Sequence, residues 1–302
     1  MAIEFNALKA LLFAKTVGVD YSKIVTIGRQ QLQIDHDDLD DLFKLFNIPV
    51  TKAELRSILY GNNGYAESLL EILGATDILS IDASPYEGAS LVHDMNFPIA
   101  AHLKNKYSLV IDGGSLEHIF NFPMAIKNCM EMLQEGGCFI GITPANNFMG
   151  HGFYQFSPEL YFRVFSHENG FVIKKIIACE SIPKACWYEV MDPKIVGERV
   201  GILSCRGVFL FILAQKLNDA VIFASPPQQS DYINLWNNSD NQFNKNLKRN
   251  IIDNLFNGRL GSMIMNNILI KMIKKPINYL RRFNPKMFKK IDIIHYIKHG
   301  EL

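Results

Sequence analysis

Short apolar segments alternate with amphipathic segments along the first 217 residues of the chain. The apolar segments are rich in β-branched and aliphatic residues, and each ends at a polar or glycine-containing turn, as buried strands do. Seven strands are predicted, at 23–27, 77–81, from 91 to about 94, 108–111, 138–142, 171–178 and 207–214. The segments between several of them have apolar residues at helical spacing. Strands separated by helices predict right-handed βαβ units, and therefore an α/β fold with a parallel sheet.

Polar side chains gather where the fourth and fifth predicted strands end. Asp112, Glu117 and His118 follow the fourth strand, and Asn146 follows the fifth. In open parallel sheets the ligand site lies at the carboxyl ends of the strands. The sequence therefore predicts a functional site at this edge of the sheet.

Two motifs at this edge resemble those of a known enzyme family. They are DGGSLEH at 112–118 and LQEGGCFIGITP at 133–144, and HGFYQFSPELYFRVFSHENGF follows at 151–171. Over about residues 22–217 the chain resembles class I S-adenosylmethionine-dependent methyltransferases, and it is similar to a bacterial subgroup found near surface-glycan and secondary-metabolite genes. The resemblance implies a Rossmann-like, seven-stranded, mostly parallel sheet with helices on both faces and an antiparallel last strand. It also implies S-adenosyl-L-methionine as the cofactor.

The loop after the first predicted strand departs from the family pattern. The family has several glycines here, which let the backbone approach the ligand closely. This chain reads Gly28-Arg29-Gln30-Gln31 and keeps only the first glycine. Two interpretations stay open, a rearranged cofactor loop or the loss of cofactor binding.

The resemblance implies a set of cofactor-binding residues at the strand ends. An acidic residue after the second strand accepts hydrogen bonds from ribose hydroxyls, and one after the third contacts the adenine amino group. The alternative for both carboxylates is ordinary turn chemistry. The residues expected to bind the cofactor are Gly28, Arg29, Asp82, Ala83, Asp94, Met95, Asp112 and Gly113.

Two histidines are the candidate general bases if the methyl acceptor is a hydroxyl. His118 follows the fourth strand, and His151 lies between two glycines on the loop after the fifth. A structural role is the alternative for each. No spacing in the sequence identifies a metal site, so none is expected. The residues expected to bind the substrate are Glu117, Asn146, Tyr154 and Gln155.

The predicted methyltransferase-like domain spans 1–217, with two excursions. Residues 35–62 read as a helical insertion, which begins with an acidic run. Thr51 and Glu54 have the spacing of a capping box within it. Residues 181–204 look irregular, and are either a lid over the substrate pocket or a surface excursion. A linker and a basic helical C-terminal extension are expected over 218–302.

Charge is distributed unevenly along the chain. Residues 244–302 contain 13 Lys+Arg and 3 Asp+Glu, so the remainder contains 18 (31 − 13) and 27 (30 − 3). The basic region is expected to pack on the acidic body or a second subunit, as in a homodimer, or to contact a membrane surface. No nucleic-acid motif is found, and nucleic-acid binding is not expected.

The remaining composition places the chain among cytoplasmic proteins, with peripheral contact at the inner membrane as an alternative. Five cysteines without a CxxC motif argue against a disulfide framework. There is no apolar run of about 18 residues and no secretory signal. The function expected is methyl transfer to a small molecule or glycan precursor, at a hydroxyl. The alternative is a catalytically inactive methyltransferase-like scaffold that binds a partner.

Overall fold

The computed structural model describes residues 2–237, 282–283 and 287–299. The strands of its main sheet are β2 (Lys23–Ile27), β4 (Asp77–Asp82), β5 (Leu91–Val92), β6 (Tyr107–Asp112), β7 (Leu133–Asn146), β8 (Phe171–Glu180), β9 (Trp187–Val190), β11 (Val208–Lys216) and β13 (Phe288–Lys290). Two strand pairs lie outside this sheet, β1 (Ala2–Ile3) with β3 (Gln31–Leu32), and β10 (Ile202–Leu203) with β12 (Arg282–Phe283). The α-helices are α1 (Phe5–Thr16), α2 (His36–Leu45), α3 (Lys52–Tyr60), α4 (Glu67–Ile72), α5 (Phe122–Met132), α6 (Pro158–Val164), α7 (Pro193–Val196), α8 (Ser230–Asn237) and α11 (Ile293–His299).

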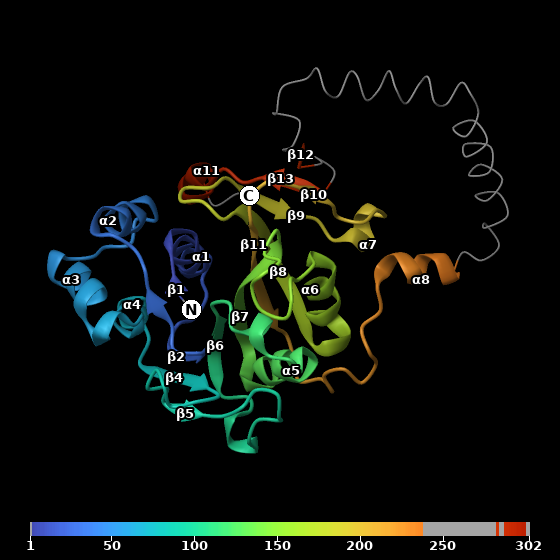
Figure 1. Cartoon of the computed structure of the whole chain (residues 1–302), viewed down its shortest axis with the longest axis horizontal. Coiled ribbons are helices and arrows are strands. Elements are labelled where there is room, and N and C mark those ends of the chain that lie inside the picture. The colour runs from blue at the N-terminus through green and yellow to red at the C-terminus, as the bar shows by residue number, and fades with distance from the viewer. Residues whose placement is uncertain (1, 238–281, 284–286, 300–302) are drawn as a thin grey trace, which may run out of the picture.

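The main sheet is mixed, and nine strands form it within the described residues. Their order in space is β13-β9-β8-β11-β7-β6-β2-β4-β5 (Figure 1). The pairs from β7 to β5 are parallel, and the pairs from β7 to β13 are antiparallel. All seven predicted strands are present, and the last of them, β11, is antiparallel to both of its neighbours as expected. The prediction of a seven-stranded, mostly parallel sheet is nevertheless wrong.

The two additional strands come from regions that the sequence pattern did not identify as strands. β9 lies in the stretch 181–204, which was expected to be irregular, and pairs with β8 along Trp187 to Glu189. β13 comes from the C-terminal region and pairs with β9. Because each has only three or four residues, neither gives a clear period-2 pattern in the sequence.

Helices cover both faces of the sheet, so its strands are buried on both sides. Along β2, Ile24 packs toward α1–α4, whereas Val25 packs toward α5 and α6. In β6, Leu109 packs on the same face as Ile24, and Val110 packs on the same face as Val25. This explains the continuous apolar runs in the sequence, which are typical of parallel strands covered on both faces.

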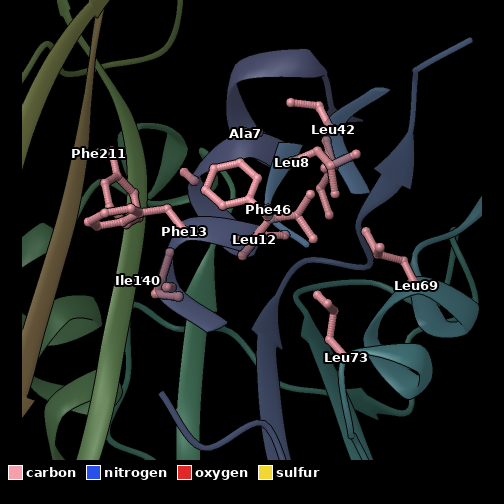
Figure 2. Close-up of a cluster of buried hydrophobic side chains, with 14 of the residues drawn as sticks. Ala7, Leu8, Leu12, Phe13, Leu42, Phe46, Leu69, Leu73, Ile140 and Phe211 are labelled. Atoms are coloured by element: carbon pink, nitrogen blue, oxygen red, sulfur yellow. The ribbon is translucent and has the colours of Figure 1, made fainter. Parts of the chain in front are cut away.

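Helix α1 is the centre of the larger core cluster. Its buried side chains include Leu8, Leu12 and Phe13, which lie between the sheet and the helices of the insertion (Figure 2). Figure 2 shows Phe13 beside Ile140 of β7 and Phe211 of β11. The N-terminal helix is therefore part of the core.

The predicted insertion is helical. It contains α2 and α3, and the capping box of Thr51 and Glu54 is formed, with the Thr51 side chain accepting a hydrogen bond from the backbone N–H of Glu54. Asp35 caps α2 through the backbone N–H of Asp38. The acidic run is thus the start of a helix, where carboxylates interact favourably with the helix dipole.

Residues after 217 connect back to the body where they are described. Met287, Phe288, Ile291 and Ile293 are buried against the body, and Tyr296 of α11 packs on Phe13. The rest of the expected basic helical extension, at 238–281, 284–286 and 300–302, lies outside the described residues. Of the helices that are described, none combines the length and apolar character needed to cross a membrane.

Candidate functional site

A first cavity lies at the carboxyl ends of β2, β4 and β6. Its volume is about 280 Å³. Six of the eight residues predicted to bind the cofactor line it: Gly28, Arg29, Asp82, Ala83, Asp94 and Met95. Strand ends meet here because β2 is paired in parallel with β4 and β6, and β4 is paired in parallel with β5, which Asp94 and Met95 follow. The structure therefore brings the predicted residues of three separate strand ends into one cavity.

Two carboxylates face this first cavity from neighbouring turns. Asp82 Oδ1 accepts a hydrogen bond from the backbone N–H of Ser84 at 3.0 Å. Asp94 Oδ1 accepts from the backbone N–H and the side-chain amide of Asn96, at 2.9 and 2.7 Å. These two bonds lower the pKa of Asp94, so it is ionised at neutral pH. Oδ2 of Asp94 takes part in neither bond.

Arg29 is held by the protein itself. Its Nε donates to Glu67 Oε1 at 2.6 Å, and Nη1 donates to the backbone carbonyl of Glu87 at 3.1 Å. The guanidinium also stacks on Tyr65, 3.9 Å from the ring centroid. The arginine therefore ties the loop after β2 to α4 and to the segment that follows β4.

Gln30 packs inside the loop that follows β2. It is buried, and its Nε2 donates to the backbone carbonyl of Ile27 at 2.7 Å. A Cβ built on Gly113 would lie only 2.1 Å from Oε1 of Gln30. A larger residue at 113 would therefore force the Gln30 side chain to move. Sequence reasoning did not find this contact, and both interpretations of the loop stay open.

Asp112 does not line the first cavity, and its binding of the cofactor stays a prediction. It is fully buried, and Oδ1 accepts hydrogen bonds from the backbone N–H groups of Ser115 and Leu116, at 2.7 and 3.2 Å. Burial raises the pKa of Asp112, an effect that these backbone donors oppose. The carboxylate therefore positions the turn at 113–116. Gly113, the eighth predicted residue, lies on the other side of that turn.

A second cavity of about 310 Å³ lies on that other side. Its apolar wall comes from α1, β7, β9 and β11 and includes Ile142, Trp187, Phe209 and Phe211. Glu117 and His151 line it too, and Glu4 adds a carboxylate. Of the described residues that line this cavity, none is lysine or arginine.

Glu117 is the buried carboxylate of the second cavity. It is 1% exposed, and neither carboxylate oxygen has a hydrogen-bond partner among the described residues. His151 Nε2 lies 3.4 Å from Oε1, close enough for an ion pair. Burial raises the pKa of Glu117, and the nearby Asp112 raises it further.

The two predicted bases come together at Glu117. His118, in the 3-10 helix η3 (Leu116–His118), lines the first cavity, and its ring lies 5.0 Å from the ring of His151. The loop that carries His151 is fixed there because Phe153 N–H donates to the carbonyl of Glu117 at 2.8 Å. Burial, followed by the nearby His151, lowers the pKa of His118. Two residues 33 positions apart in sequence thus flank one carboxylate.

The other predicted substrate-binding residues lie outside both cavities. Tyr154 Oη donates to the carbonyl of Phe120 at 2.6 Å, and Gln155 Oε1 accepts from Phe148 N–H at 2.7 Å. Asn146 is in β7, where it pairs with Val208. In this structure Tyr154, Gln155 and Asn146 hold the loop around His151 in place through these contacts. Their binding of substrate stays a prediction.

Sequence reasoning missed several polar residues of the second cavity, and two of them have polar atoms that the described residues leave unpaired. Asn6 and Trp187 line it, and neither Oδ1 of Asn6 nor Nε1 of Trp187 has a hydrogen-bond partner among the described residues. Asn6 comes from α1, which the sequence did not connect with the site, and Trp187 comes from β9, within the stretch for which a lid was one of two interpretations. A lone tryptophan in an irregular-looking stretch was the only signal available.

Comparison with known proteins gives structural likeness only. No family model and no curated protein matches the sequence. The N-methyltransferase NodS from Bradyrhizobium japonicum is 11% identical and has a TM-score of 0.39, over 71% of this chain and 97% of its own. The branched-chain polyamine synthase from Thermus thermophilus is 13% identical, with a TM-score of 0.35 over 75% and 61%. The 1,6-didemethyltoxoflavin-N1-methyltransferase from Burkholderia thailandensis is 9% identical, with a TM-score of 0.35 over 71% and 79%. Likeness at this level does not assign an activity.

Proposed function

We propose that the protein is an S-adenosylmethionine-dependent methyltransferase that acts on a small molecule. One observation carries this proposal: the turn at 113–118 separates two cavities, and neighbouring residues of the turn line different ones. Ser115 and His118 line the first cavity, whereas Gly114 and Glu117 line the second. A methyl donor in the first cavity and an acceptor in the second would meet at this turn.

The residues of the first cavity fit S-adenosylmethionine. Asp82 and Asp94 offer carboxylate oxygens for the ribose hydroxyls and the adenine amino group. Met95 offers an apolar surface for the adenine ring. Gln30 offers a buried amide whose Oε1 lacks a hydrogen-bond partner among the described residues, which is the kind of acceptor that an ammonium group needs. The cavity volume is at the lower end of the range for small-molecule sites.

Positioning is the main contribution expected of these residues. When bound, S-adenosylmethionine supplies an electrophilic methyl group, and transfer needs the acceptor atom to be held in line with it. Glu117 and His151 would accept the proton of an acceptor hydroxyl. In the tautomer in which His151 Nε2–H donates to Glu117, Nδ1 is the nitrogen that takes the proton. Glu117 would then stabilise the imidazolium that forms.

The second cavity favours neutral or cationic acceptors. Glu4 and Glu117 provide negative charge, and the described lining holds no lysine or arginine to balance a phosphate. Trp187 and Asn6 offer one unpaired donor and one unpaired acceptor beside an apolar wall. We therefore propose an acceptor with an apolar part and at least one hydroxyl, such as a glycan precursor without a phosphate group.

Calorimetric titration of the full chain with S-adenosylmethionine and S-adenosylhomocysteine tests this function. We expect micromolar dissociation constants for the wild type. Asp82→Asn and Asp94→Asn should each weaken binding about 10- to 100-fold, because a hydrogen bond to a charged group contributes about 1.5–3 kcal/mol.

Asp77→Asn is the matched control, since Asp77 is an exposed carboxylate at the opposite end of β4 from Asp82. It should leave binding unchanged. The absence of binding by folded wild type at millimolar ligand would overturn the enzyme proposal. The second candidate function, an inactive methyltransferase-like scaffold, would then be favoured, because Arg29 and Gln30 are already bonded within the protein.

A further inference from the structure

Three potential metal-binding side chains meet between the two cavities. Glu117, His118 and His151 each offer one ligand atom, and these three atoms lie within 4.8 Å of one another. Glu117 and His118 are neighbours in η3, and His151 reaches them from the loop after β7. We define this trio as the Glu-His-His cluster.

One of the three separations in the cluster is that of a coordination site, and the other two are at most 4.8 Å. Zinc binds imidazole nitrogen and carboxylate oxygen at about 2.0–2.2 Å, so two of its ligand atoms lie about 3–3.6 Å apart. Glu117 Oε1 and His151 Nε2 are 3.4 Å apart, within that range. Their backbones are held together, because Phe153 N–H donates to Glu117 O at 2.8 Å and Gly152 packs against Glu117.

A second, independent feature favours a cation at this place. The carboxylate of Glu117 is 1% exposed, and both of its oxygens lack hydrogen bonds from the described residues. A carboxylate in such a place is costly unless it is paired or coordinates a metal. The second cavity, which it faces, has no lysine or arginine in its described lining. His151 is 44% exposed in its side chain, so an ion has a path to the cluster from solvent.

We propose that the Glu-His-His cluster binds one divalent ion of the first transition row. Two imidazoles and one carboxylate are a ligand set used for such ions, and they leave further coordination positions open. The role of the ion rests on the proposed function. A hydroxyl oxygen of the acceptor would occupy an open position facing the second cavity. With the ion bound, Glu117 and His151 are its ligands, so the hydroxyl would give its proton to water and the ion would stabilise the alkoxide that forms.

Metal titration of the full chain tests the site without any cofactor. The protein is stripped with EDTA, desalted and titrated calorimetrically with Mn²⁺ and Zn²⁺, and Co²⁺ is added separately to record visible absorption. We expect one ion per chain. Glu117→Gln, His118→Ala and His151→Ala should each weaken binding at least tenfold and change the Co²⁺ bands. His102→Ala, which removes an exposed histidine outside the cluster, is the control and should bind as the wild type does.

Two outcomes would overturn the site. One is no binding of any of the three ions at millimolar concentration by folded wild type. The other is binding that Glu117→Gln and His151→Ala leave unchanged, which would locate the ion elsewhere, for example at the acidic start of α2. Folding of each variant is checked by circular dichroism. Because binding of S-adenosylhomocysteine is measured separately, failure of the metal site is distinguishable from failure of the methyltransferase proposal.

Discussion

Phe13→Ala is expected to lower the free energy of unfolding by about 3–5 kcal/mol, the usual cost of removing a fully buried phenylalanine. Phe13 is 0% exposed. Its ring contacts Trp187 at 5.7 Å, Phe211 at 6.3 Å and Tyr296 at 5.4 Å between centroids. One side chain therefore joins α1, β9, β11 and α11, and its removal leaves a cavity among elements that are far apart in sequence.

Urea unfolding followed by circular dichroism measures this effect. Tyr60→Ala is the control, because it also removes an aromatic ring from a helix, but the ring of Tyr60 is 79% exposed. It should change stability by less than about 0.5 kcal/mol. A loss below about 1 kcal/mol in Phe13→Ala would mean that β9 and α11 do not pack on α1 as described.

The role of Phe13 shows where the sequence pattern stops being informative. The apolar residues of α1, such as Leu8, Leu11 and Leu12, have helical spacing, which is a signal between residues close in sequence. Its partners Trp187 and Tyr296 lie about 170 and 280 residues further along the chain. Hydrophobic periodicity contains no information about contacts between residues so far apart in the sequence. Strands β9 and β13 were not predicted for the same reason. Each is a strand because it pairs with a neighbouring strand, β9 with β8 and β13 with β9.

The lining of the first cavity was more predictable than that of the second. Asp82 and Asp94 follow strands, and the carboxyl ends of parallel strands share one edge, so strand prediction alone places both of them at the first cavity. The contact between the Gln30 side chain and Gly113 was not predictable, because it joins two different loops. Asn6 and Trp187 likewise reach the second cavity only through tertiary packing.

The pairing of Glu117 with His151 is an intermediate case. Both were identified as candidate residues because they follow β6 and β7, two strands that are neighbours in the sheet. Their assigned roles were separate, one in substrate binding and one in proton transfer. The structure places Nε2 of His151 3.4 Å from Oε1 of Glu117, so the two act on one another. The order of the strands predicted that Glu117 and His151 lie near one another, but it did not predict their contact.

Glu117→Gln is expected to make the metal-free protein more stable above neutral pH. Burial raises the pKa of Glu117 above its value in the unfolded chain, so the folded state holds a proton that the unfolded state has already lost. The free energy of unfolding of the wild type therefore falls as pH rises from about 4.5 toward the raised pKa, by up to about 1.4 kcal/mol per pH unit. Glutamine has nearly the same shape and never ionises. The part of the fall in the free energy of unfolding that Glu117 causes should therefore be absent from the variant.

Urea unfolding in EDTA at several pH values between 5 and 8 measures the difference. Near pH 5 the two proteins should have similar stability, because Glu117 is then protonated in the fold. By pH 8 the variant should be more stable by about 2 kcal/mol, a value reduced from the single-group limit because Asp112 titrates together with Glu117. Glu71→Gln removes one exposed carboxylate from α4 and controls for the change in net charge. A variant that is less stable than the wild type at pH 8 would show that the ionised carboxylate is stabilised in the fold, and that His151 is its charged partner.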